Sequence, residues 1–224
     1  MNTPGLIRLV LAFSLLAGAA KGQNLLVNGS FENYGGTSAN SDKGIALPGW
    51  TIGTEGGIDI VFSSDASGFR GPYWQAADGD VSLSLNWFTP DSISQNVGTQ
   101  AGVTYQLSFE MAAEIFGGPA LRTMDVLWDN VVVGSPSFVY SGQGPQNMGW
   151  TQFVYNVVGT GNDVLTFHST TPDNYGPALD AVSLVAAVPE PGVVPFCFLA
   201  MLAWAKLAER LWRALLRHNT IKPC

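Results

Sequence analysis

Cysteine is missing from most of the chain. Of the 224 residues only Cys197 and Cys224 are cysteines, and both lie near the C-terminal end. The segment between residues 24 and 188 therefore has no internal disulfide, no cysteine-ligated zinc and no thiol nucleophile. Its hydrophobic core, alone or with a bound metal ion, must supply its stability.

Positive charge is also scarce. Charged residues make up 12% of the chain, about half of the usual share. Between residues 24 and 188, three basic residues (Lys43, Arg70 and Arg122) stand against fifteen acids, which gives this segment a formal charge of −12. So acidic a segment repels phosphate backbones, which argues against a nucleic-acid partner. Its carboxylates can instead hold hard cations.

Signatures of catalysis are absent. The chain has two histidines: His168, which strand alternation places on an outer face, and His218 near the C-terminus. It contains no Gly-x-Ser-x-Gly, His-Glu-x-x-His or phosphate-loop motif. We therefore predict that the protein is not an enzyme. A pair of carboxylates suited to glycoside hydrolysis stays open as a less favoured alternative, because the sequence does not give the distance between them.

The residues that are abundant indicate β-structure. With 26 glycines, 13 prolines, 46% hydrophobic and 11% aromatic residues, the chain is neither a helical bundle nor disordered. Apolar residues alternate with polar ones, as in Thr104–Met111, and Asp129-Asn130 reads as a tight hairpin turn. This pattern predicts an all-β fold, an antiparallel two-sheet sandwich of jelly-roll type. The predicted strands are Leu25–Val27, Gly49–Ile52, Ile58–Phe62, Val81–Leu85, Ser92–Val97, Thr104–Met111, Met124–Trp128, Val131–Val133, Thr151–Val157, Asp163–His168 and Ala178–Val185.

The first 22 residues read as an export signal. Arg8 precedes the apolar run Leu9–Leu16, and the small residues Ala17–Ala20 follow it. This order is typical of a signal peptide, and an N-terminal buried helix is the alternative. The predicted domains are therefore a signal peptide over 1–22, a β-sandwich over 23–187 and a tail over 188–224.

The tail begins with a proline-containing domain boundary, continues with an apolar run and ends with a predicted basic helix. Two prolines in Val188–Gly192 disfavour helix and ladder alike. The apolar run Val193–Ala205 is short for a membrane span, and Lys206–His218 separates leucines from basic residues on helical spacing. We expect this C-terminal helix to engage the membrane, either across it or along its surface. A terminal helix packed on the domain is the alternative.

The tail resembles the PEP-CTERM sorting signal of bacterial exosortase systems. The resemblance rests on Pro189, Glu190 and Pro191, followed by the apolar stretch and the closing basic cluster. It implies processing by exosortase-type machinery and delivery to the cell surface or extracellular matrix.

The middle segment contains a series of short motifs in a fixed order: Asn24–Glu32 with Asn28-Gly-Ser-Phe-Glu32 at its end, Pro48-Gly49-Trp50, Asp78-Gly79-Asp80, Ile93–Val97, Gly102–Phe109 and Gly176–Leu184. On these motifs the segment resembles the DUF642 and "choice-of-anchor C" group of galactose-binding-like modules, which look like carbohydrate-binding modules. Ser84 departs from this group, which often has an acid there.

The same resemblance implies a structural calcium ion. In carbohydrate-binding modules of this fold, the acid of the Phe-Glu motif and the acid of the last strand commonly ligate calcium, and Glu32 and Asp180 match them. Two carboxylates brought close repel each other unless a cation or proton lies between them. Asp78 and Asp80 form a weaker second candidate. Each of these acids could instead cap a turn or face solvent.

Aromatic residues supply the candidate ligand surface. Sugar rings stack their apolar faces on aromatic side chains. We predict that Trp50 and Trp150, on strands, belong to the core, and that loop aromatics are exposed. The candidate ligand-binding residues are Tyr73, Trp74, Trp87, Phe88 and Tyr175.

These observations predict an exported, surface-anchored, non-catalytic module that binds extracellular polysaccharide or another glycan. A structural extracellular-matrix or biofilm protein without a small ligand is the alternative, followed by a glycan-active hydrolase.

Overall fold

The computed structural model describes residues 22–34, 40–41, 46–63, 74–187 and 209. The chain forms two compact units, Met1–Ala187 and Val188–Cys224. The predicted signal peptide up to residue 21, the motif Pro189–Pro191 and the C-terminal helix apart from Glu209 lie outside the described residues. Within the described parts of the chain, no helix has the length and apolar character needed to span a bilayer.

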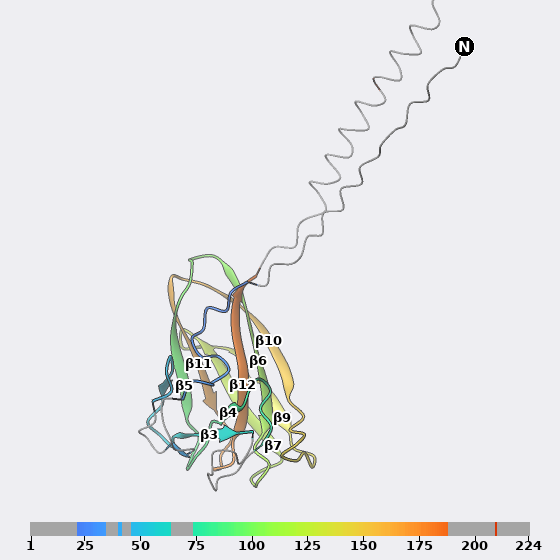
Figure 1. Ribbon diagram of the computed structural model, residues 1–224. Coiled ribbons are helices and arrows are strands. Elements are labelled where there is room, and N and C mark those ends of the chain that lie inside the picture. Colours follow the sequence, from blue (N-terminus) through green and yellow to red (C-terminus); the bar gives the residue numbers. More distant parts are fainter. Residues whose placement is uncertain (1–21, 35–39, 42–45, 64–73, 188–208, 210–224) are drawn as a thin grey trace, which may run out of the picture. The chain divides into compact units, whose positions relative to one another are not determined.

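The first unit consists of two antiparallel β-sheets (Figure 1). In sheet A, β12 lies between β4 and β6, so the last strand of the chain occupies the middle of the sheet. The order of strands in sheet A is β1 (Asn40–Ser41), β3 (Ile58–Phe62), β4 (Val81–Ser84), β12 (Pro177–Ala186), β6 (Thr104–Ala113) and β10 (Thr151–Val158).

Sheet B packs against it, with β11 between β5 and β7. The prediction of an all-β, antiparallel, two-sheet sandwich is confirmed. The order in sheet B is β2 (Thr51–Ile52), β5 (Ser92–Gly98), β11 (Asn162–Ser169), β7 (Leu121–Trp128) and β8 (Val131–Gly134), with β9 (Ser137–Val139) paired to β7.

The core lies between the sheets and follows the period of two. On β6, Leu107, Phe109 and Met111 are buried and face sheet B, while the residues between them face outward. On β11, Phe167 meets Phe109 edge-on, with ring centroids 4.9 Å apart and planes at 79°. Burial of each such side chain stabilises the fold by about 1.5–3 kcal/mol.

The predicted hairpin turn joins β7 to β8. Asp129 and Asn130 have φ angles of 52° and 63°, the left-handed conformation that a two-residue hairpin loop of this type requires. The carboxylate of Asp129 also accepts a hydrogen bond from the N–H of Val164 at 2.8 Å, which fixes the turn against β11.

The prediction of a strand over Leu25–Val27 is wrong, because these residues join no ladder. A bulge between Asp180 and Ser183 interrupts the pairing of β12, and the side chain of Asn24 fills the interruption. Its amide donates to the carbonyl oxygen of Val182 (3.0 Å) and its oxygen accepts from the N–H of Leu184 (2.9 Å). The opening segment therefore still lies along the closing strand.

Candidate functional site

The two acids predicted as calcium ligands hold the same loop. The carboxylate of Asp180, fully buried on β12, accepts hydrogen bonds from the N–H groups of Ala77 (2.7 Å) and Asp78 (2.9 Å). Glu32, which is exposed, accepts from the N–H groups of Asp80 (2.8 Å) and Val81 (2.9 Å). The first and last segments of the domain are thereby fastened to the loop 77–81.

The hydrogen bonds that these two carboxylates accept from backbone N–H groups hold the loop 77–81 in place without requiring a metal ion. The second oxygen of Asp180 accepts from the N–H of Ala181 at 2.6 Å. Burial, together with the charge of Asp78, raises the pKa of Asp180 to about 7 against the effect of its three hydrogen bonds. Among the residues described, no three or more His, Cys, Asp or Glu side chains are grouped so that they could hold a metal ion. Calcium takes about six to eight oxygen ligands, so main-chain oxygens would have to complete such a site.

A groove lies on the outer face of sheet A, beside this loop. We call it the Trp150 groove. Its volume is about 460 Å³, which is in the range of small-ligand sites. Four separate segments contribute to it: the chain before the loop 77–81, β6, the segment before β10 and the bulge of β12. Its lining residues are Gln75, Ala76, Ala77, Glu110, Asn147, Met148, Gly149, Trp150 and Ala181.

Trp150 is held in a fixed orientation in this groove. Its indole N–H donates to the carbonyl oxygen of Gln75 at 2.8 Å, and the N–H of Gln75 donates to the carbonyl oxygen of Pro145 at 2.7 Å. The prediction that Trp150 belongs to the core is confirmed in part, because its ring packs against the hydrophobic core but is only half-buried, and its remaining surface lines the groove. Trp50, by contrast, is buried as predicted.

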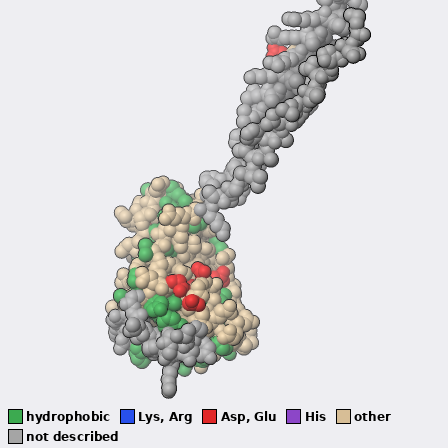
Figure 2. Space-filling view, viewed as in Figure 1, with side chains coloured by type: hydrophobic (Ala, Val, Ile, Leu, Met, Phe, Trp, Pro, Cys, Tyr) green, Lys and Arg blue, Asp and Glu red, His purple; other side chains and the backbone are tan. Residues whose placement is uncertain are grey.

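Glu110 provides the charged side chain of the groove. It lies on the outward-facing side of β6, opposite Gln152 of β10 and Asp180 of β12. Partial burial raises its pKa, and among the described residues no hydrogen bond or ion pair engages its carboxylate. The described part of the face in Figure 2 displays acidic side chains beside a hydrophobic patch and no basic one.

The expectation of an exposed Trp74 is wrong. Its side chain is 0% exposed, and its indole N–H donates to the hydroxyl of Ser82 at 2.9 Å. Ser82 is on the outer side of β4, where its small size leaves room for the indole. The partly exposed ring of Phe116 stacks on Trp74 at 6.2 Å. Tyr73, predicted with Trp74, is outside the described residues.

Trp87 and Phe88 form a stacked pair, with ring centroids 4.6 Å apart and planes at 16°. We call it the aromatic pair. Phe88 is 63% exposed and Trp87 is half-buried. Their N–H groups donate to the carbonyl oxygens of Gly56 and Gly57, and the buried carboxylate of Asp91 accepts from the N–H groups of the same two glycines. The pair therefore sits on a rigid support.

Tyr175, the remaining candidate, is half-buried and lies on a turn of glycines. A Cβ atom at Gly117 would lie 2.6 Å from the ring of Tyr175, so the ring rests directly on the backbone. Beneath this turn lies Arg122, whose Nη2 donates to the carbonyl oxygens of Glu114 and Gly117. Its Nε and Nη1 atoms are buried without a hydrogen-bond partner among the described residues, and burial lowers the pKa of its guanidinium group.

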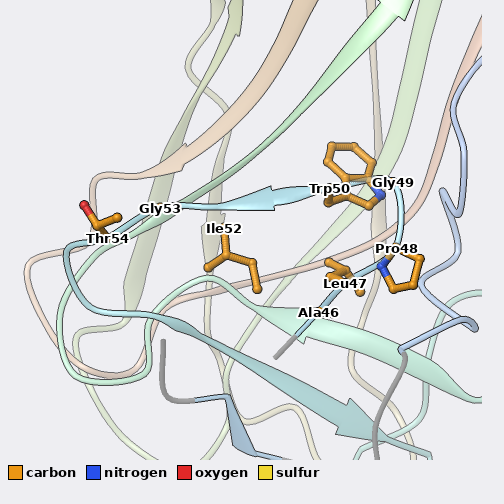
Figure 3. Close-up of a pocket in the computed structure, with 8 residues that line it drawn as sticks. All are labelled: Ala46, Leu47, Pro48, Gly49, Trp50, Ile52, Gly53 and Thr54. Carbon is orange, nitrogen blue, oxygen red and sulfur yellow. The ribbon is translucent and has the colours of Figure 1, made fainter. Parts of the chain in front are cut away.

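A second pocket of about 430 Å³ is lined by the single segment 46–54 (Figure 3). Its side chains are apolar apart from Thr54 and the indole N–H of Trp50, which donates to the carbonyl oxygen of Asn28 at 3.0 Å. Few polar groups are thus available to orient a ligand there.

A family model described as "Protein of unknown function (DUF642)" matches residues 24–185. The chain belongs to the DUF642 family. The match spans the described sandwich, including both the loop 77–81 and the Trp150 groove.

Other similarities of this DUF642 chain are more distant. It is 27% identical over 179 residues to halomucin of Haloquadratum walsbyi, covering 75% of this chain and about 2% of that protein's length. TmCBM61, solved in complex with β-1,4-galactotriose, is similar with 20% identity and a TM-score of 0.47, over 74% of this chain and 99% of that one. A family 35 carbohydrate-binding module from Clostridium thermocellum is similar with 19% identity and a TM-score of 0.43, over 62% and 92%.

Four residues of the Trp150 groove were not recognised from the sequence as site residues: Gln75, Glu110, Asn147 and Trp150. Trp150 reads as the first residue of a strand, and Glu110 as one of several outward-facing polar residues on β6. No local pattern signals that the two side chains line the same groove.

Proposed function

We propose that this DUF642 domain binds carbohydrate without altering it, and that the Trp150 groove is the binding site. One observation carries the proposal: a fixed, half-exposed indole, a carboxylate and two amide side chains line a single groove. The indole offers a face for the C–H groups of a sugar ring. Glu110, Gln75 and Asn147 offer acceptors and donors for its hydroxyls.

The lining of the groove supports binding rather than hydrolysis. Glycoside hydrolysis ordinarily uses two carboxyl groups that flank the scissile bond. Of the described residues that line the groove, Glu110 is the one that carries a carboxyl group. The other acid nearby, Asp180, has both oxygens engaged by backbone N–H groups.

The test is affinity electrophoresis of the full chain in gels that contain soluble galactan, xylan or β-glucan. At least one glycan should retard the native chain. Trp150→Ala should abolish the retardation, because stacking on the ring is lost, whereas Phe88→Ala should leave it unchanged. Circular dichroism confirms that both variants are folded. If Phe88→Ala abolishes retardation and Trp150→Ala does not, the groove is not the site.

We also propose that calcium stabilises the junction of Glu32, Asp180 and the loop 77–81. The support is that both carboxylates converge on one loop. An ion bound only by the folded state raises stability by mass action. A chelator should therefore lower the melting temperature of the full chain and added calcium should restore it. Glu32→Gln should remove the response, and an unchanged melt in the native chain would exclude the site.

Export and anchoring form the third part of the proposal. The signal peptide and the PEP-CTERM-like tail would carry the domain to the cell surface or matrix, with exosortase-type machinery and the membrane as partners. Deletion of residues 189–224 should release the protein into the medium. Retention of the truncated chain at the envelope would place the anchor elsewhere.

A structural matrix role is the second candidate, and the exposed edge of sheet A favours it. The edge strand β10 contains neither charged residues nor proline, which are the usual protections of a free edge. Val154 and Val158 on it are 47% and 55% exposed. Analytical ultracentrifugation of the full chain and of Val154→Lys decides this: concentration-dependent assembly lost in the variant supports the matrix role, and a monomeric native chain excludes assembly through this edge.

A further inference from the structure

The Trp150 groove contains the carboxylate of Glu110, and no positively charged side chain of the described residues pairs with it. Glu110 faces the groove without a hydrogen bond or ion pair among the described residues. Among the described residues, Arg122 is the one lysine or arginine. Its side chain is fully buried, and its Nη2 donates to two backbone carbonyl oxygens. No cationic side chain of the described residues is therefore available to a ligand in the groove.

This charge distribution discriminates between classes of sugar. A uronate or sulfated sugar would bring a second negative charge next to Glu110, within an acidic segment, and would be repelled. A neutral sugar could donate hydroxyl hydrogen bonds to the carboxylate. A sugar with a protonated amino group would form a charge-assisted hydrogen bond, which is roughly twice as strong as a neutral one.

The environment of Glu110 favours a cationic ligand over a neutral one. Partial burial raises the pKa of this carboxyl group, because its charge loses water without gaining a counter-ion. An ammonium group beside it would supply that counter-ion. Gln75 and Asn147, both uncharged, remain available for the hydroxyls of the same sugar.

We propose that the Trp150 groove selects amino sugars with a free ammonium group, which pairs with the carboxylate of Glu110 while the sugar ring stacks on Trp150. This inference rests on the proposed carbohydrate binding and names its ligand class. N-acetylation removes the charge of the amino group, so an acetylated sugar of the same stereochemistry is the matched neutral ligand.

The test is isothermal titration calorimetry of the full chain with three oligomers of equal length: glucosamine, N-acetylglucosamine and the cello-oligomer. The glucosamine oligomer should bind at least about tenfold more tightly than the other two at low salt, and added salt should reduce the difference. Glu110→Gln should bring the three affinities within about twofold of one another. Trp150→Ala should weaken the binding of all three.

Glu55→Gln is the matched control, because it removes one exposed negative charge from a residue that does not line the groove. It should keep the preference for the amino oligomer. If Glu55→Gln and Glu110→Gln reduce that preference equally, the attraction belongs to the net charge of the domain and the inference is wrong. Equal binding of neutral and amino oligomers by the native chain, lost in Trp150→Ala, overturns the inference and leaves carbohydrate binding intact. Failure of all three oligomers to bind overturns the inference, and the polysaccharide gels then decide the broader proposal separately.

Discussion

The Trp150 groove and the aromatic pair both expose aromatic rings, but they differ in what surrounds the rings. In the groove, a carboxylate and two amides line the same cavity as the indole. At the aromatic pair, Trp87 and Phe88 stack on each other, and the neighbouring side chains of Asp91 and Asn86 bind backbone groups, while Oδ1 of Asn86 is buried without a hydrogen-bond partner among the described residues. Asp91 holds Gly56 and Gly57, and the amide of Asn86 donates to the carbonyl oxygens of Thr171 and Asp173. We therefore expect sugar binding in the Trp150 groove rather than at the aromatic pair, because hydroxyl groups of a sugar need polar partners beside the ring.

The largest difference between the Trp150 groove and the aromatic pair should appear when the buried aspartate that supports each of them is removed. Asp180→Ala leaves three backbone N–H groups without an acceptor, and so does Asp91→Ala, whose carboxylate accepts from Gly56, Gly57 and Ser92. Each variant should lose roughly 2–4 kcal/mol of unfolding free energy, measured by urea denaturation. At a temperature where both remain folded, only Asp180→Ala should lose glycan retardation, because the wall at Ala77 moves. Equal loss of retardation in both variants would contradict the assignment of Asp180 as the residue that specifically holds the Trp150 groove.

The pH dependence of stability should distinguish sheet A from sheet B. Burial raises to about 7 the pKa of Asp59 and Asp180, which lie in sheet A, and that of Glu114, which directly follows strand β6 of that sheet. Their folded states hold protons more tightly than their unfolded states, so stability is full below about pH 4 and is lost as pH rises to about 7. In calcium-free buffer the loss is at most about 4 kcal/mol for each aspartate and about 3 kcal/mol for Glu114.

Asp163 in sheet B behaves in the opposite way. Burial disfavours its charge, but hydrogen bonds from Thr99 and Thr160 outweigh burial and hold its pKa at about 2. Its contribution is therefore lost only as pH falls below about 4. Urea denaturation at pH 4.5 and pH 8 should show the more stable protein at the lower pH. Glu114→Gln should reduce that difference, because it removes one of the three contributing groups, and a domain that is more stable at pH 8 without calcium would contradict these assignments.

The smallest expected effect belongs to the aromatic pair. Phe88→Ala removes an exposed ring whose one aromatic contact among the described residues is with Trp87, so the unfolding free energy should change by no more than about 0.5 kcal/mol. Thermal denaturation followed by circular dichroism measures it. A loss of several kcal/mol would show that the ring belongs to the packed structure rather than to its surface.

Local patterns in the sequence predict most of the fold. Alternation identifies the long strands, and Ile58–Phe62 is predicted with the bounds that the structure gives it. Asp129-Asn130 is predicted as a tight turn because both residues tolerate positive φ. Short elements escape this reasoning: β9 has three residues and β1 has two, which is too few for a period to be visible.

The site is less predictable because it depends on contacts between distant segments. Trp74 follows the sequence Gly71-Pro72, which predicts exposure, yet Ser82, eight residues later, offers a small outward side chain over which the indole is buried. Trp150 directly precedes strand β10, yet its neighbour in space is Gln75, which is 75 residues away in the chain. Which aromatic ring stays exposed depends on what the opposite segment places over it, and no local pattern carries that information.

The most direct test of the central claim observes both aromatic sites in one experiment. The full chain, labelled with ¹⁵N, is titrated with a glycan that retards it in gels, and the indole N–H signals are followed by NMR. The signal of Trp150 should shift progressively and that of Trp87 should remain in place. A shift of Trp87 with Trp150 unchanged would contradict binding in the Trp150 groove.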